Sequence, residues 1–156
     1  MRVKSPGKSD WNKLVCLMKY LNVIVNNILT LSAMNNSLCL LWYIDAAFAI
    51  HPDFKSHTGA IMKFAGGKGA VISQSNKQKL NTASSTTAEL VGIVDILPLV
   101  LWVPLFLEEQ GYIVKDNIMY QDNKSAIKLE ENGKQSSGKQ THTLNIRYFM
   151  ITDQVK

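Results

Sequence analysis

Three acidic side chains occupy positions where ordinary surface charges are uncommon. Asp45 interrupts the apolar run LLWYIDAAFAI, Glu89 follows SSTTA at the start of a long apolar segment, and Asp122 directly follows the strand-like IMYQ. An ionised carboxylate in an apolar setting is costly unless a cation or hydrogen-bond donors compensate it. The sequence therefore raises the question of which partners these three carboxylates have.

Each carboxylate has a simpler explanation when it is considered alone. Asp45 can face water from an edge strand or from a bulge. Thr86 and Glu89 have the T-x-x-E spacing of a helix capping box, and Asp122 stands where the N-cap of a following helix is expected. These alternatives stay open for the single residues.

Considered together, the three carboxylates fit one geometry. One lies in a strand, one in the first turn of a later helix, and one at a strand end, where α/β sheets place ligand groups. If the strands of Asp45 and Asp122 are neighbours, the three side chains converge. Clustered carboxylates raise one another's pKa values, and divalent cations relieve their repulsion. The set predicts bound Mg²⁺, and a pair of such ions suits phosphodiester cleavage.

Periodicity and turn residues predict the elements that must position these side chains. We expect an amphipathic helix over 11–21, a hairpin around 35–36, and a strand pair, AIMKFA and AVISQS, joined by GGKG. A long helix over 86–110 is expected to end at Gly111. The strand NIMYQ, the helix NKSAIKLEEN and a helical last segment, THTLNIRYFMITDQV, follow. This order predicts an α/β protein in which helices pack on a mixed sheet of antiparallel strands and one parallel strand.

Composition narrows the class of protein. The 156 residues are 46% hydrophobic, which is enough for the core of one domain, and the net charge of +5 suits an anionic partner such as nucleic acid. Cys16 and Cys39 lack the spacing of a metal site and are expected to be small core residues. The N-terminus has no apolar signal segment, so we expect an intracellular location, cytoplasmic or nuclear, and not secretion.

One apolar segment has nearly the length of a membrane span. Residues 90–107 carry a single charge, Asp95, which would cost about 2.5–3.5 kcal/mol in a bilayer. Pro98 and Pro104 add helix defects, and a proline inside a helix costs about 3 kcal/mol or more and kinks it. We therefore expect a buried core helix and no membrane partner.

Six motifs follow one another along most of the chain: YIDAAFA, KSHTGAIMKF, GGKGAVISQSNKQ, ASSTTAEL, MYQDNKSAIKL and HTLNIRYFMI. In this order they closely resemble the ribonuclease H domain of copia-type retrotransposon polyproteins. Residues 1–26 resemble the segment that connects the reverse transcriptase to that domain, and residues 27–156 resemble the ribonuclease H-like domain itself.

The resemblance implies a ribonuclease H-like fold with a mixed five-stranded sheet. It also implies cleavage of the RNA strand of RNA–DNA hybrids with two Mg²⁺ ions, or with Mn²⁺ in their place. Asp45, Glu89 and Asp122 match the catalytic, metal-binding acids of the family. The implied partners are the hybrid and the reverse transcriptase portion of the polyprotein, and the implied location is the virus-like particle of a retroelement.

Basic and polar side chains around this site are expected to contact the sugar–phosphate backbone, and ordinary solvation is the alternative for each lysine. The expected contacts are Lys77, Lys79, Ser85, Thr86, Asn123, Lys124 and Arg147.

The sequence departs from the family pattern at several positions. Thr87 replaces the first Glu of S-S-T-E-A-E, Pro104 stands where a basic residue is common, and K-H-I-D becomes HTLN at 142–145. The family continues into a further strand and a helix with a fourth acid, so we expect a domain that is incomplete at its C-terminus. Two functions follow: an endonuclease acting on RNA–DNA hybrids during reverse transcription, or a catalytically inactive nucleic-acid-binding remnant of a mobile element.

Overall fold

The computed structural model describes residues 5–33 and 37–132. Its elements in chain order are α1 (Lys8–Val23), β1 (Ser37–Ala47), β2 (His57–Phe64), β3 (Ile72–Lys77), α2 (Ser85–Glu109), β4 (Ile113–Tyr120) and α3 (Lys124–Asn132). The chain divides into two compact units between residues 30 and 31, and α1 belongs to the first. The boundary expected after residue 26, and the roles assigned on either side of it, stay predictions.

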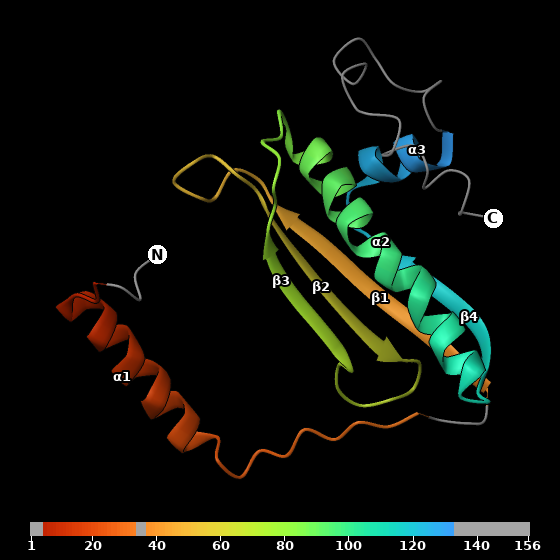
Figure 1. The fold of residues 1–156 in the computed structure, drawn as a ribbon, viewed down its shortest axis with the longest axis horizontal. Helices are drawn as coiled ribbons and strands as arrows, with labels where there is room; N and C mark the ends of the chain where they lie inside the picture. The colour runs from red at the N-terminus through yellow and green to blue at the C-terminus, as the bar shows by residue number, and fades with distance from the viewer. Residues whose placement is uncertain (1–4, 34–36, 133–156) are drawn as a thin grey trace. The chain divides into compact units, whose positions relative to one another are not determined.

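Within the described residues, the four strands form one mixed sheet in the order β3-β2-β1-β4 (Figure 1). β1 pairs with β2 in antiparallel and with β4 in parallel orientation, and β2 pairs with β3 in antiparallel orientation. Two neighbouring parallel strands need a crossover connection, and α2 lies in the connection that precedes β4. The fold is the mixed α/β architecture expected from the sequence, and it is consistent with a ribonuclease H-like fold.

The side chains of β1 alternate between two faces of the sheet. Leu40, Trp42 and Ile44 are buried in the core with aliphatic side chains of α2, which lies along this face (Figure 1). Tyr43 and Asp45 point to the opposite face and are exposed; this is called the open face below. Since β1 lies between two neighbours and its register shift lies at its other end, Asp45 occupies neither an edge strand nor a bulge.

α2 is long and apolar enough to cross a membrane by length and composition, and in the structure it packs on the sheet as a core helix. It continues through Pro98 and Pro104 without interruption. Gly111 follows its end with a φ of 86°, a left-handed conformation that glycine adopts readily. The expected C-terminal glycine cap is therefore confirmed, and the Gly111 N–H donates to the Glu108 carbonyl oxygen.

Asn117 of β4 ties α2 to the central strand. Pro104 has no N–H, so the carbonyl oxygen of Val100 has no donor four residues later in α2. The Asn117 side chain donates its Nδ2–H to that oxygen at 2.9 Å and accepts the indole Nε1–H of Trp42 at 2.9 Å. One amide thereby satisfies both a helix carbonyl and the N–H of a fully buried tryptophan.

The expected hairpin before β1 is wrong. Residues 28–33 form no strand, Ile28 and Leu29 are exposed, and the expected turn lies outside the described residues. A strand needs hydrogen-bonding neighbours, and both sides of β1 are occupied by β2 and β4. The helical segment expected after residue 140 also lies outside the described residues.

Both capping alternatives for the acidic residues are also wrong. Ser84 is the N-cap of α2, and its Oγ accepts the N–H of Thr87 at 3.1 Å, so Glu89 lies in the second turn and not in a capping box. Asn123, and not Asp122, caps α3 with its Oδ1. The carboxylates of Glu89 and Asp122 are therefore not used as helix caps.

The cysteines depart from the expectation as well. Cys16 is exposed on α1, and Cys39 is half-buried in β1. The amphipathic stripe of α1 is solvent-exposed too, with Trp11, Leu14 and Met18 each about half exposed or more. The apolar face predicted for this helix is present on α1 itself.

Candidate metal centre

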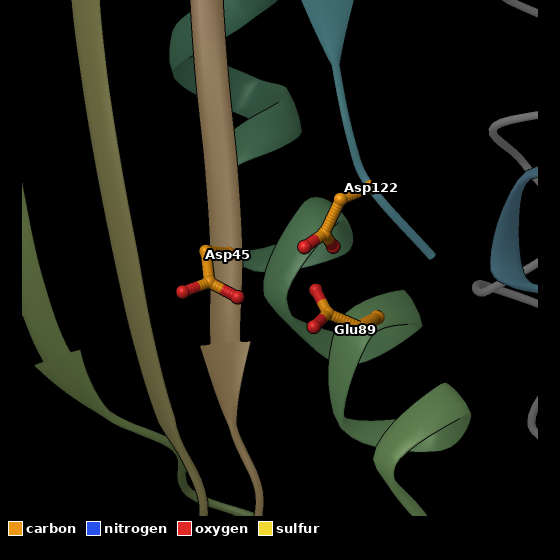
Figure 2. Close-up of side chains that lie close together, drawn as sticks. All are labelled: Asp45, Glu89 and Asp122. Atoms are coloured by element: carbon orange, nitrogen blue, oxygen red, sulfur yellow. The ribbon is translucent and has the colours of Figure 1, made fainter. Parts of the chain in front are cut away.

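Asp45, Glu89 and Asp122 converge at one end of the central strand. Each offers a carboxylate oxygen, and these three atoms all lie within 4.8 Å of one another. Figure 2 shows the side chains pointing toward one another from β1, from α2 and from the segment after β4. The parallel pairing of β1 with β4 brings Asp122 close to Asp45. Tyr43 pairs with Tyr120, the last residue of β4, and the chain then continues past Asp45.

The three carboxylates differ in burial. Glu89 is only 5% exposed, whereas Asp45 and Asp122 are exposed. The Glu89 carboxylate accepts the Nε2–H of Gln121 at 3.2 Å and a backbone N–H from Ala46. A buried, anchored carboxylate thus lies beside two solvent-facing ones.

Burial raises the pKa of Glu89 above its usual value. The negative charges of Asp45 and Asp122 raise this pKa further, and the hydrogen bonds from Gln121 and Ala46 oppose the rise. The expected mutual repulsion is therefore present at Glu89, although desolvation has the larger effect.

Two residues of the site were not found by sequence reasoning. Gln121 holds Glu89, and Glu130 lies nearby on the buried side of α3 with an exposed fraction of 9%. Burial, followed by the charges of Glu89 and Glu131, raises the pKa of Glu130 to about 7. The available signals were the position of Gln121 at a strand end and the four-residue spacing of Glu130 from the buried Ala126.

The Oε1 atoms of Gln121 and Glu130 are both buried and have no hydrogen-bond partner among the residues that the structure describes. Both side chains line a cavity of about 470 Å³ between β4 and α3. A buried acceptor without a donor is costly, and protonation of a carboxylate lowers that cost. This agrees with the raised pKa of Glu130.

Some residues expected to contact nucleic acid lie close to the carboxylates along the chain. Ser85 and Thr86 form the first turn of α2, about one turn before Glu89. Lys124 begins α3 two positions after Asp122 and is exposed. Ser85 and Thr86 therefore share α2 with Glu89, and Lys124 is a neighbour of Asp122 in sequence.

The other residues expected to contact nucleic acid either have partners within the protein or lie further from the carboxylates along the chain. The Oδ1 of Asn123 accepts the N–H groups of Ser125 and Ala126. Lys77 forms an ion pair with Asp53, with 2.7 Å between Nζ and Oδ2, and the pair holds the pKa of Asp53 below its usual value. Lys79 is exposed after β3, and Arg147 lies outside the described residues.

A depression of about 640 Å³ opens on the open face beside the carboxylates. Its lining includes Tyr43, Asp45, Gly59, Ser75, Tyr120 and Asp122. The rings of Tyr43 and Tyr120 stack with centroids 5.1 Å apart and form one wall. The carboxylates of Asp45 and Asp122 are therefore reachable from solvent across the open face.

The mixed sheet and the cluster define an α/β protein with a three-carboxylate candidate metal centre at the end of its central strand. The chain is similar in sequence to the retrovirus-related Pol polyprotein from transposon TNT 1-94 of Nicotiana tabacum, with 30% identity over 154 residues. The match covers 98% of this chain and 11% of that relative. The chain is thus homologous to a segment of a retrotransposon Pol polyprotein. No protein-family model and no solved structure matches it.

Proposed function

We propose that this chain is a ribonuclease H domain that hydrolyses the RNA strand of RNA–DNA hybrids during retrotransposon reverse transcription. The observation that carries the proposal is the convergence of Asp45, Glu89 and Asp122 within 4.8 Å on a mixed α/β sheet. The similarity to a Pol polyprotein supports it, because reverse transcription produces RNA–DNA hybrids. The hybrid and the reverse transcriptase portion of the polyprotein are the proposed partners.

The three carboxylates suit Mg²⁺, or Mn²⁺ in its place. Their ligand atoms are all carboxylate oxygens, the donors that hard cations prefer. Two oxygens on opposite sides of one Mg²⁺ are about 4.2 Å apart, so a set spanning 4.8 Å needs only small side-chain movements to hold an ion. When bound, a pair of such ions supplies an activated water and neutralises charge at the leaving oxygen.

Neighbouring groups of the protein orient the Glu89 carboxylate for metal binding. Gln121 and the N–H of Ala46 hold Glu89 in one orientation and favour its ionised form. Asp45 and Asp122 keep their carboxylates toward the solvent-filled depression, where a phosphodiester can approach. Ser85, Thr86 and Lys124 are proposed to contact sugar or phosphate around the scissile bond, and the 2′-hydroxyl is the group by which RNA can be distinguished from DNA.

A cleavage assay on a hybrid labelled in either strand tests the proposal. We expect the RNA strand to be cut in Mg²⁺ or Mn²⁺, with 5′-phosphate and 3′-hydroxyl ends, and the DNA strand to stay intact. Asp45→Asn should lower the rate at least about 100-fold, since it removes a carboxylate from the proposed centre. Asp116→Asn is the matched control, because Asp116 is an exposed carboxylate on β4 outside the cluster.

The outcomes separate the two functions that the sequence allows. Hybrid binding without cleavage by the intact chain identifies an inactive nucleic-acid-binding remnant. Cleavage that survives Asp45→Asn overturns the assignment of the site. Absence of both binding and cleavage overturns the proposal.

A further inference from the structure

Two histidines beside the candidate centre have no role in the proposed hydrolysis. His57 Nδ1 lies 3.0 Å from His51 Nε2, and His57 Nε2 lies 2.7 Å from the Oγ of Ser75. Ser75 lines the same depression as Asp45 and Asp122. A chain of hydrogen bonds therefore runs from the β1–β2 loop to the edge of the depression.

Strand pairing places Ser75 in line with the candidate centre. Asp45 of β1 pairs with Gly59 of β2, and Gly59 pairs with Ser75 of β3. Directly paired residues project from the same face of a sheet, so these three positions form one row across the open face. With neighbouring strands about 4.8 Å apart, the row spans about 10 Å.

Gly59 leaves the middle of this row empty. A Cβ atom added at Gly59 would meet only the Asp45 carbonyl oxygen, at an ordinary contact distance of 3.9 Å. The fold itself therefore does not require glycine at this position. Its missing side chain instead keeps the depression open between Asp45 and Ser75.

The hydrogen-bond chain can present a donor to the depression. A neutral imidazole has one donor and one acceptor nitrogen, so the chain has two possible directions. When His51 Nε2–H donates to His57 Nδ1, His57 Nε2–H donates to Ser75 Oγ, and the hydroxyl proton of Ser75 can point into the depression. An anion in the depression can accept a hydrogen bond from this hydroxyl, and that bond stabilises this direction of the hydrogen-bond chain.

We propose that Ser75 binds a backbone phosphate of the nucleic acid, and that His57 and His51 are positioning residues which orient its hydroxyl. The inference rests on the proposed function. A span of about 10 Å corresponds to about three nucleotides at 3.4 Å of axial rise, so the bound phosphate lies within about three nucleotides of the scissile one. Lys77, which pairs with His57 across β2 and β3, adds a cation near this end of the row, partly neutralised by Asp53.

Hybrid affinity and turnover, measured separately, test this inference. Binding is followed in Ca²⁺ by fluorescence anisotropy, and kcat is measured in Mg²⁺. Ser75→Ala should weaken binding about fivefold, because one hydrogen bond to a phosphate is lost, and it should lower kcat by a smaller factor than it lowers the affinity. Ser73→Ala is the matched control, since Ser73 is an exposed serine on the same strand outside the depression, and its affinity should equal that of the wild type.

His57→Ala should weaken binding about as much as Ser75→Ala, and the double variant should be no weaker than Ser75→Ala alone. Gly59→Val should fill the depression and weaken binding more than about tenfold, while thermal unfolding confirms that the variant is folded. A Cβ atom at position 59 meets only the Asp45 carbonyl oxygen at 3.9 Å, so in a folded variant a loss of binding indicates that the side chain obstructs the depression.

The results distinguish this inference from the proposed function. If the wild type binds and cuts the hybrid while Ser75→Ala and Gly59→Val behave like Ser73→Ala, the phosphate contact is wrong and the proposed function stands. If the losses of His57→Ala and Ser75→Ala add, His57 does not act through Ser75. If the wild type neither binds nor cuts, both proposals are overturned.

Discussion

The side chain of Asn117 donates to the carbonyl oxygen of Val100 at 2.9 Å and thereby replaces the hydrogen bond that Pro104 cannot donate. The same amide accepts the indole N–H of the buried Trp42. Through this pair, β4 compensates a defect in α2 while it is itself tied to the central strand. The helix that carries Glu89 is thus anchored to the two strands that position Asp45 and Asp122.

Asn117→Ala should lower the free energy of unfolding by about 2–4 kcal/mol, because it leaves one donor and one acceptor unsatisfied in partly buried positions. Urea denaturation measures the change. In a Pro104→Ala background the helix supplies its own N–H to Val100, so Asn117→Ala should cost about 1 kcal/mol less there. Identical losses in the two backgrounds would contradict the compensation.

Glu130→Gln should stabilise the protein at high pH. The folded-state pKa of Glu130 is raised to about 7, above its ordinary value of 4.5, so the folded state binds more protons than the unfolded state between these pH values. Stability therefore falls as pH rises through this window. Removing the ionisable group should recover about 2 kcal/mol at pH 8, after allowance for solvent screening, and almost none below pH 4.5.

Urea denaturation in EDTA between pH 4 and pH 8 measures this difference. Glu131→Gln is the matched control, since Glu131 is the adjacent exposed carboxylate. It removes only the smallest of the causes that raise the pKa of Glu130, so its stability should differ from that of the wild type much less than the stability of Glu130→Gln does. A constant difference between Glu130→Gln and the wild type across the pH range would show that Glu130 ionises normally in the folded protein.

Gln121→Ala should shift the acid limb of the pH–rate profile to higher pH. Gln121 donates to Glu89 and opposes the rise of its pKa, so its loss should raise that pKa further. Glu89 has to be ionised to hold a cation, and a higher pKa means that more of it is protonated at a given pH. Activity should therefore fall more at acid pH than at pH 8.

Gln110→Ala is the control for this variant, because Gln110 is an exposed glutamine at the end of α2, away from the carboxylates. The profile of this control should overlay that of the wild type. An equal loss at every pH for Gln121→Ala would indicate a purely structural role for this side chain.

Asp45→Asn should have opposite effects on stability with and without metal. In EDTA it removes a charge that raises the pKa of Glu89, so the Tm near neutral pH should rise. In Mg²⁺ the wild type should gain more in Tm than the variant, since bound metal stabilises the folded state. Thermal unfolding with increasing Mg²⁺ measures both effects.

Asp116→Asn should show neither change, because this exposed carboxylate lies outside the cluster. A Mg²⁺-dependent gain in Tm that is equally large for Asp45→Asn and the wild type would show that the ion binds elsewhere.

The elements with strong local signals could be predicted from the sequence. The apolar length of α2 and its terminal Gly111, and the GGKG turn between β2 and β3, are local features, and the structure confirms them. The expected strand before β1 failed because an apolar run becomes a strand only where a neighbour can pair with it, and both sides of β1 are taken.

For the candidate site, the sequence alone determined which three carboxylates to consider and the condition for their convergence, namely that the strands of Asp45 and Asp122 are neighbours. Tertiary structure decided that this pairing occurs and that Glu89 is buried while Asp45 faces solvent. It also decided that Gln121 and Glu130 lie beside Glu89. Burial and long-range hydrogen bonds depend on residues far apart in the chain, so no local pattern specifies them.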